Sequence, residues 1–143
     1  MEYIYKNKNI HIKYQMSDKS TILKTFNTQF FAFLNDIVSI LPDNMDIKTA
    51  IKSFETIKKA NPTIILKAWS SSVYVPYKTS IDNGDIDFFV NKDYKEDLNY
   101  ISNSQEVMKV IDTIREPIRS MDDVNRTHTI KYIQILSKLS ELY

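Results

Sequence analysis

A single glycine, Gly84, occurs in the 143 residues of this chain. Glycine is the residue that allows a backbone to approach a phosphate closely or to turn through positive φ. A dinucleotide-binding fingerprint needs three glycines, and a phosphate-binding loop followed by lysine needs at least two. The sequence therefore excludes most glycine-rich nucleotide-binding loops. Where the chain turns, it has to rely mainly on proline, asparagine and aspartate.

The composition is that of one ordinary globular domain, with 43% hydrophobic and 26% charged residues. With a net charge of +1, no overall electrostatic field attracts the chain to nucleic acid or to an anionic membrane. Because cysteine is absent, disulfides, thiolate metal sites and a cysteine nucleophile are excluded. Two histidines are too few for a histidine-built metal site, and we expect neither a metal nor a cofactor. No apolar run or leader predicts a membrane span or a signal peptide.

Apolar residues recur at three- and four-residue steps along most of the chain, a pattern typical of amphipathic helices. Short polar turns separate these segments, so successive helices should be neighbours. We therefore predict an all-α fold, a compact bundle of five to six helices, over residues 17–143. The predicted boundaries are a first cap at Ser17 or Ser20, a stop at Pro42, a second start at Asp46, a third at Asn61 and Pro62, a kink or end at Pro76, and a last start at Asp122 or Asp123.

Residues 1–16 alternate apolar and polar side chains, which predicts a short hairpin or an extended N-terminal arm. Tyr3 and Tyr5 lie on this arm together with several lysines. Such a pattern could contact phosphates and bases, and a nucleic-acid-binding module is therefore one hypothesis. No arginine precedes position 115, however, so bidentate contacts to bases are missing in this region. Nucleic acid is accordingly the less favoured partner.

Asp85 and Asp87, with Ile86 between them, form the sharpest chemical motif. Nucleotidyltransferases hold magnesium with an Asp-apolar-Asp pair on a strand, and a Gly-Ser turn upstream grips the triphosphate. Here Trp69 stands where that glycine should be, and no third carboxylate is identifiable. The favoured interpretation is that Gly84 ends one helix and that the two carboxylates cap the next. A reduced nucleotidyltransferase with catalytic Asp85 and Asp87 on Mg²⁺ is the alternative.

Adjacent phenylalanines occur at positions 30 and 31 and again at 88 and 89. Two successive residues of a helix cannot both face one core. We therefore expect the surplus rings Phe31, Phe88 and Phe89, together with Tyr3 and Tyr5, to contact a protein partner or a second copy of the chain. His128 has no serine or aspartate partner that the sequence can identify, so an ordinary, partly exposed histidine is expected there.

Four segments, residues 57–67, 75–77, 84–89 and 128–133, resemble small uncharacterised proteins of large nucleocytoplasmic DNA viruses, the giant viruses. The resemblance extends from about Phe26 onward and brings no assigned activity or catalytic residue. It implies a viral protein from an A/T-rich genome, in agreement with the excess of Lys, Asn and Ile. The sequence thus predicts a non-enzymatic interaction or structural protein in the host cytoplasm or the virion, with a host or viral protein as its partner.

Overall fold

The computed structural model describes residues 18–85, 87 and 112–143, and this part of the chain is an all-α bundle, as predicted. The N-terminal arm with Tyr3 and Tyr5 lies outside the described residues, as do Phe88 and Phe89. The described elements are α2 (Lys19–Ile40), α3 (Met45–Ala60), α4 (Ile64–Ala68), the π-helical η1 (Trp69–Tyr74), α5 (Val75–Asp82), α8 (Arg115–Arg119) and α9 (Asp123–Leu142). No helix among them is long and apolar enough to cross a membrane.

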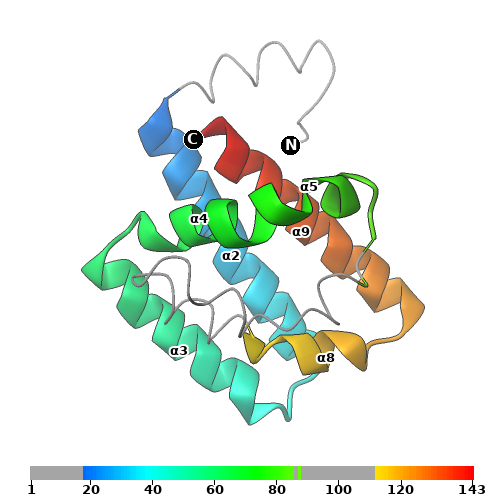
Figure 1. The fold of residues 1–143 in the computed structure, drawn as a ribbon. Coiled ribbons are helices and arrows are strands. Elements are labelled where there is room, and N and C mark those ends of the chain that lie inside the picture. The colour runs from blue at the N-terminus through cyan, green and yellow to red at the C-terminus, as the bar shows by residue number, and fades with distance from the viewer. Residues whose placement is uncertain (1–17, 86, 88–111) are drawn as a thin grey trace.

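Helices α2 and α9 pack against each other through the middle of the bundle (Figure 1). The end of α9 returns to the start of α2, where the Lys19 ammonium lies 5.0 Å from the centre of the Tyr143 ring. The continuous helical segment of α4, η1 and α5 crosses this central pair, and α3 lies beside α2. Because α2 contacts α9 on one side and α3 on another, its faces meet different surroundings.

The helix starts follow from side-chain caps on residues with extended backbone. Asp18, Asn44 and Asp122 each accept a hydrogen bond from an amide two or three residues later, at 3.0, 3.1 and 2.8 Å. The last start confirms the prediction for Asp122. The first two differ from it, since Asp18 caps α2 and Asn44 caps α3 while Asp46 lies in the first turn. Several polar residues at each start can cap, and backbone conformation selects the one that does.

The third predicted start, at Asn61 and Pro62, also differs in detail. Asn61 ends α3, and its side-chain oxygen accepts from the amide of Thr63 at 3.1 Å. Thr63 is the cap position of α4, and its side chain makes no capping hydrogen bond. Pro62 therefore lies in the turn between the two helices and not in the first turn of α4. This turn brings the Pro62 carbonyl against α2, where it contributes to the site described below.

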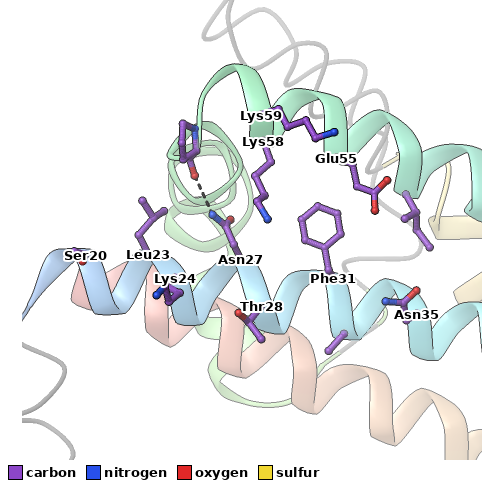
Figure 2. A pocket seen from close by; sticks show the side chains of 13 residues that line it. Ser20, Leu23, Lys24, Asn27, Thr28, Phe31, Asn35, Glu55, Lys58 and Lys59 are labelled. Atoms are coloured by element: carbon purple, nitrogen blue, oxygen red, sulfur yellow. Dashed lines mark hydrogen bonds between the residues drawn. The ribbon is translucent and has the colours of Figure 1, made fainter.

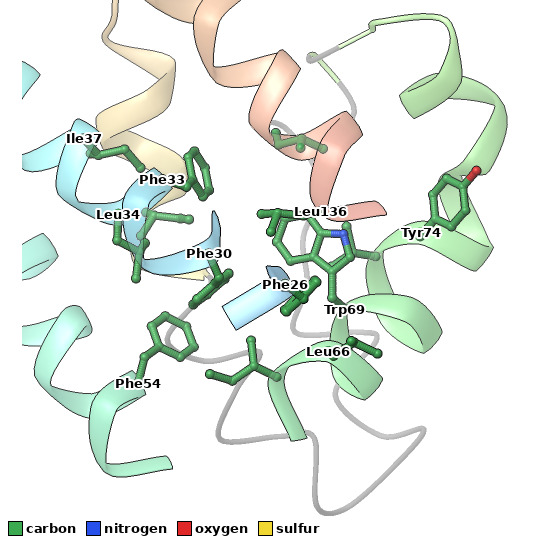
Figure 3. Close-up of a cluster of buried hydrophobic side chains, with 14 of the residues drawn as sticks. Phe26, Phe30, Phe33, Leu34, Ile37, Phe54, Leu66, Trp69, Tyr74 and Leu136 are labelled. Atoms are coloured by element: carbon green, nitrogen blue, oxygen red, sulfur yellow. The ribbon is translucent and has the colours of Figure 1, made fainter. Parts of the chain in front are cut away.

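Trp69 is the largest fully buried side chain of the core (Figure 3). Its ring lies 6.5 Å from that of Phe26 and 6.2 Å from that of Phe30, both in edge-on geometry. Phe54 of α3 packs on Phe30 at 4.8 Å. The buried indole Nε1 donates to Ser137 Oγ at 3.0 Å, which ties η1 to α9. The core is therefore apolar, and the edge-on ring contacts together with the hydrogen-bonded indole also fix the orientation of its aromatic side chains.

Pro76 bends the helix that contains it, as predicted. The preceding six residues widen into the π-helical turn η1, and Tyr77 has the non-helical angles φ −123°, ψ 27°. Proline has no amide to donate, and its ring crowds the carbonyl four residues earlier, so a widened turn is the ordinary accommodation. The helix then continues to Asp82.

Gly84 has φ +76° and ends α5, which confirms the interpretation of the lone glycine. Its amide donates to the Ile81 carbonyl at 3.0 Å, and the amide of Asp85 donates to the Ser80 carbonyl at 2.9 Å. These two bonds satisfy carbonyls that the last helical turn leaves open, and only glycine adopts this conformation without strain.

Candidate functional site

An open groove with a volume of about 960 Å³ lies between α2 and α3 (Figure 2). Leu23, Asn27, Phe31 and Asn35 enter it from α2 at four-residue steps. Ile51, Glu55, Lys58 and Lys59 enter it from α3, and Pro62, in the turn after α3, also lines it. Four-residue spacing puts side chains in a row along one face of a helix. The groove is therefore a built feature of two helix faces, with an open side toward solvent.

Phe31 is the predicted contact residue that this groove contains. Its ring is partly exposed, whereas the neighbouring Phe30 is fully buried, and the two rings meet edge-on at 5.7 Å. Figure 2 shows the Phe31 side chain standing up between the two helices. The adjacent phenylalanines thus divide between the core and the groove, as helical geometry requires. The role of Phe31 in binding a partner stays a prediction.

Lysine side chains border the groove. The Lys58 ammonium lies 5.3 Å from the centre of the Phe31 ring, within the range of a cation–π interaction. Lys24 and Lys59 also line the groove, and Glu55 supplies the single acidic side chain among the lining residues. Within the described ranges none of these four side chains forms an ion pair. Among the described lining residues the groove therefore has three cationic side chains against one carboxylate.

Asn27 lies at the floor of the groove and is only 7% exposed. Its amide nitrogen donates to the Pro62 carbonyl at 3.0 Å, which fixes the orientation of the side chain (Figure 2). The other end of the amide, Oδ1, is buried and accepts no hydrogen bond from the residues described here. Buried acceptors are normally paired, so this oxygen marks a position where a donor is expected.

Asp85 and Asp87 lie away from this groove, at the corner that follows α5. Asp85 Oδ1 accepts from the amide of Asp87 at 3.0 Å, and Asp87 pairs with Arg126 at 3.1 Å. Asp87 is in helical conformation. The contact of Asp85 is that of a capping carboxylate, whereas Asp87 forms an ion pair, and a capping role for Asp87 stays a prediction. A small hollow of about 340 Å³ adjoins Asp87 and Arg126.

The other residues that a nucleotidyltransferase site would need do not lie together at this corner. The serines at positions 70–72 belong to the π-helical turn η1, and Ser72 is buried. Among residues 18–85, 87 and 112–143, no three acidic or histidine side chains are arranged to hold a metal ion. Asp123 lines the same small hollow as Asp87, but the carboxylates of the described residues do not form such a metal-binding group.

His128 has a partner that the sequence did not identify. Its Nε2 lies 3.1 Å from Oδ2 of Asp36, a residue of α2, and both side chains are exposed. The neighbouring Tyr132 ring meets the imidazole edge-on at 5.5 Å. Burial, followed by hydrogen bonding with Asp36, raises the pKa of Tyr132 to about 12. The group joins α2 to α9 on the surface, and such exposed pairs contribute little stability.

A second charged group joins α5 to α9. Lys78 contacts Asp82 at 3.0 Å and Glu141 at 3.5 Å, and Lys138 contacts Glu141 at 3.0 Å. Hydrogen bonding with Lys78 lowers the pKa of Asp82, and hydrogen bonding with Lys138 lowers that of Glu141. In contrast to the groove lysines, these cations are all compensated by carboxylates.

No protein-family model, curated protein or solved structure matches this chain. The candidate site therefore stands on geometry and charge. Of its residues, sequence reasoning singled out Phe31 alone. Apolar and polar side chains alternate along the four-residue row of Leu23, Asn27, Phe31 and Asn35, and this alternation was the available signal.

Proposed function

We propose that this protein is a non-enzymatic interaction module and that the groove between α2 and α3 is the surface with which it binds another protein. The observation that carries the proposal is the partly exposed Phe31 ring inside an open groove of about 960 Å³. Aromatic rings in concave, partly apolar surfaces are the usual anchors of protein interfaces. The groove floor supplies Leu23 and Ile51 as further apolar contacts.

The proposal extends to the setting in which the module acts. We propose a viral protein, present in the virion or in the host cytoplasm, with a host or viral protein as its partner. The support for this origin is the sequence resemblance over residues 57–67, 75–77, 84–89 and 128–133. Abundance in purified virus particles would favour a structural role, and its absence from them would favour a host-directed one.

Photo-crosslinking of the full chain in producing cells tests the binding surface. A photoreactive amino acid at Thr28, which is exposed at the groove, should capture a discrete protein partner. The matched control carries the same amino acid at Thr79, which is exposed on α5 away from the groove. The Thr28 adduct should disappear when Phe31→Ala is added, and it should persist with Ile135→Ala, which removes an exposed apolar side chain from α9.

Equal labelling from Thr28 and Thr79 would contradict the proposal, because it would show that the groove has no preference for a partner. An adduct that survives Phe31→Ala would exclude Phe31 as an anchor. Both results can be read from the same gel, with intact folding checked by the helical circular dichroism of each variant.

A further inference from the structure

We infer that the occupant of the groove between α2 and α3 is an amphipathic α-helix of about four turns that carries acidic side chains beside its apolar face. This inference rests on the proposed function and adds the chemistry of the partner. Two properties of the groove carry it, the length of the groove and its charge.

The groove has the length of a docking helix. Its row on α2 runs from Ser20 to Asn35, fifteen steps along one helix face, which corresponds to about 22 Å at 1.5 Å per residue. Two packed helices with an open seam between them offer the surface into which a third helix lays its apolar side. Ser20, Thr28 and Ala32 are small and line this row, so a helix backbone can approach closely. A helix of about fifteen residues would fill the seam from end to end.

The charges select acidic side chains on that helix. Lys24, Lys58 and Lys59 face the groove without an ion pair among the described residues, against the single carboxylate of Glu55. These lysines would repel basic side chains on a docked helix, whereas they would attract carboxylates placed beside its apolar face. Apolar anchors on the helix would meet Phe31 and Ile51 at the same time.

Asn27 fixes the floor of the groove and leaves the choice of partner to the length and the charges of the groove. Its amide nitrogen is held by the Pro62 carbonyl at 3.0 Å. Its Oδ1 is buried from solvent, so a docked helix meets the surrounding side chains and not this oxygen.

A nucleic acid fits the same groove less well. The face of the Phe31 ring is already met by the Lys58 ammonium at 5.3 Å, so a base would have to displace that cation in order to stack. The lining residues include no arginine, the side chain that most often pairs with phosphates and guanine.

Fluorescence anisotropy with the full chain tests the inference. The probe is a labelled helical peptide of eighteen residues with leucines at positions i, i+4, i+7 and i+11 and glutamates flanking that row. We expect a Kd between about 1 and 100 µM. A peptide with lysine in place of every glutamate should bind at least about tenfold more weakly, and rising salt should weaken only the acidic peptide.

Matched variants locate the binding. The triple change Lys24→Gln, Lys58→Gln and Lys59→Gln should weaken the acidic peptide about tenfold, and Phe31→Ala should weaken both peptides. Lys48→Gln, Lys52→Gln and Lys67→Gln together remove the same charge from exposed positions that do not line the groove, and binding should hardly change.

The outcomes separate the inference from the proposed function. Phe31-dependent binding of the basic peptide but not the acidic one overturns the inference and leaves a protein-binding groove. Binding of single-stranded oligothymidylate through the groove lysines, with no peptide binding, overturns both. A Phe31-dependent dimer in sedimentation, which the peptide does not dissociate, assigns the groove to a second copy. If neither peptide binds, the inference is wrong, and crosslinking from Thr28 still decides the proposed function.

Discussion

Helix α2 presents phenylalanine to two different environments at successive positions. Phe30 is fully buried and meets Phe26, Phe54 and Trp69, whereas Phe31 is partly exposed beside the Lys58 ammonium. One residue along a helix is a rotation of about 100°, and that rotation carries a side chain from the core to the groove. Residue type alone therefore does not separate a core residue from a contact residue. The number of neighbouring helices that enclose a side chain distinguishes a core residue from a contact residue.

Replacement of each ring by alanine gives the sharpest test of this difference. Phe30→Ala should cost about 3–5 kcal/mol of unfolding free energy, because it leaves a cavity among packed aromatic rings. Phe31→Ala should cost less than about 1.5 kcal/mol, since water already reaches part of its ring. Denaturant unfolding of the two variants measures both. Equal losses would mean that the groove is enclosed as fully as the core.

The buried hydrogen bond between Trp69 and Ser137 allows a second test of how strongly core contacts stabilise the fold. Ser137→Ala removes the acceptor of the indole Nε1 and should cost about 1–3 kcal/mol. In a Trp69→Phe background the same change should cost much less, because the donor is gone. A double-mutant cycle measures the difference. Ser71→Ala is the control, since Ser71 is exposed and bonds only to a backbone carbonyl in its own helix. Purely additive effects would contradict the coupling.

Gly84→Ala tests whether the backbone conformation at the end of α5 is required as strictly as the packing of the core. We expect a loss of about 1 kcal/mol from backbone strain at φ +76°. An added Cβ would meet Gln134 Nε2 at 3.7 Å, an ordinary contact, so steric crowding adds nothing. Asn83→Ala, at φ −85°, is the control and should be nearly neutral. A thermal melt of both variants checks the prediction, and a neutral Gly84→Ala would show that the corner relaxes.

The smallest expected effect distinguishes the paired charges on α5 and α9 from the charges of the groove, which form no ion pair among the described residues. The pKa values of Asp82 and Glu141 are lowered, so their contribution is present above the ordinary carboxyl pKa and is lost as the pH falls through the lowered values. Asp82→Asn should therefore flatten the acid side of the stability profile. Lys58→Gln, which removes a charge from the groove but no carboxylate, should leave that slope unchanged. Melting temperatures between pH 2 and 7 measure both.

Much of the fold was predictable because it depends on local signals. Three- and four-residue spacing predicted the helices, and the prolines and Asp122 predicted their breaks and the last start. Gly84 predicted a positive-φ helix end for a reason confined to its own backbone. The caps at Asp18 and Asn44 were missed because several neighbouring polar residues had the same chemical ability, and the difference lies in backbone angles.

The candidate site was predictable only through Phe31. Its other residues come from segments far apart in the chain, as Asn27 and Pro62 show, and no local pattern announces their contact. The same is true of Asp36 and His128, which α2 and α9 bring together across the surface. Long-range pairing of this kind depends on how helices pack, and short polar turns leave several packings open.

The sequence by itself determined that this chain is helical, where several of its helices begin, bend and end, and that one of two adjacent phenylalanines must leave the core. Those properties follow from the helical repeat and from backbone sterics, which act over a few residues. Tertiary structure alone decided that Phe31 enters a groove, that three lysines line this groove without an ion pair among the described residues, and that the oxygen of Asn27 is buried there. A groove is a relation between two helices, so neither helix encodes it alone.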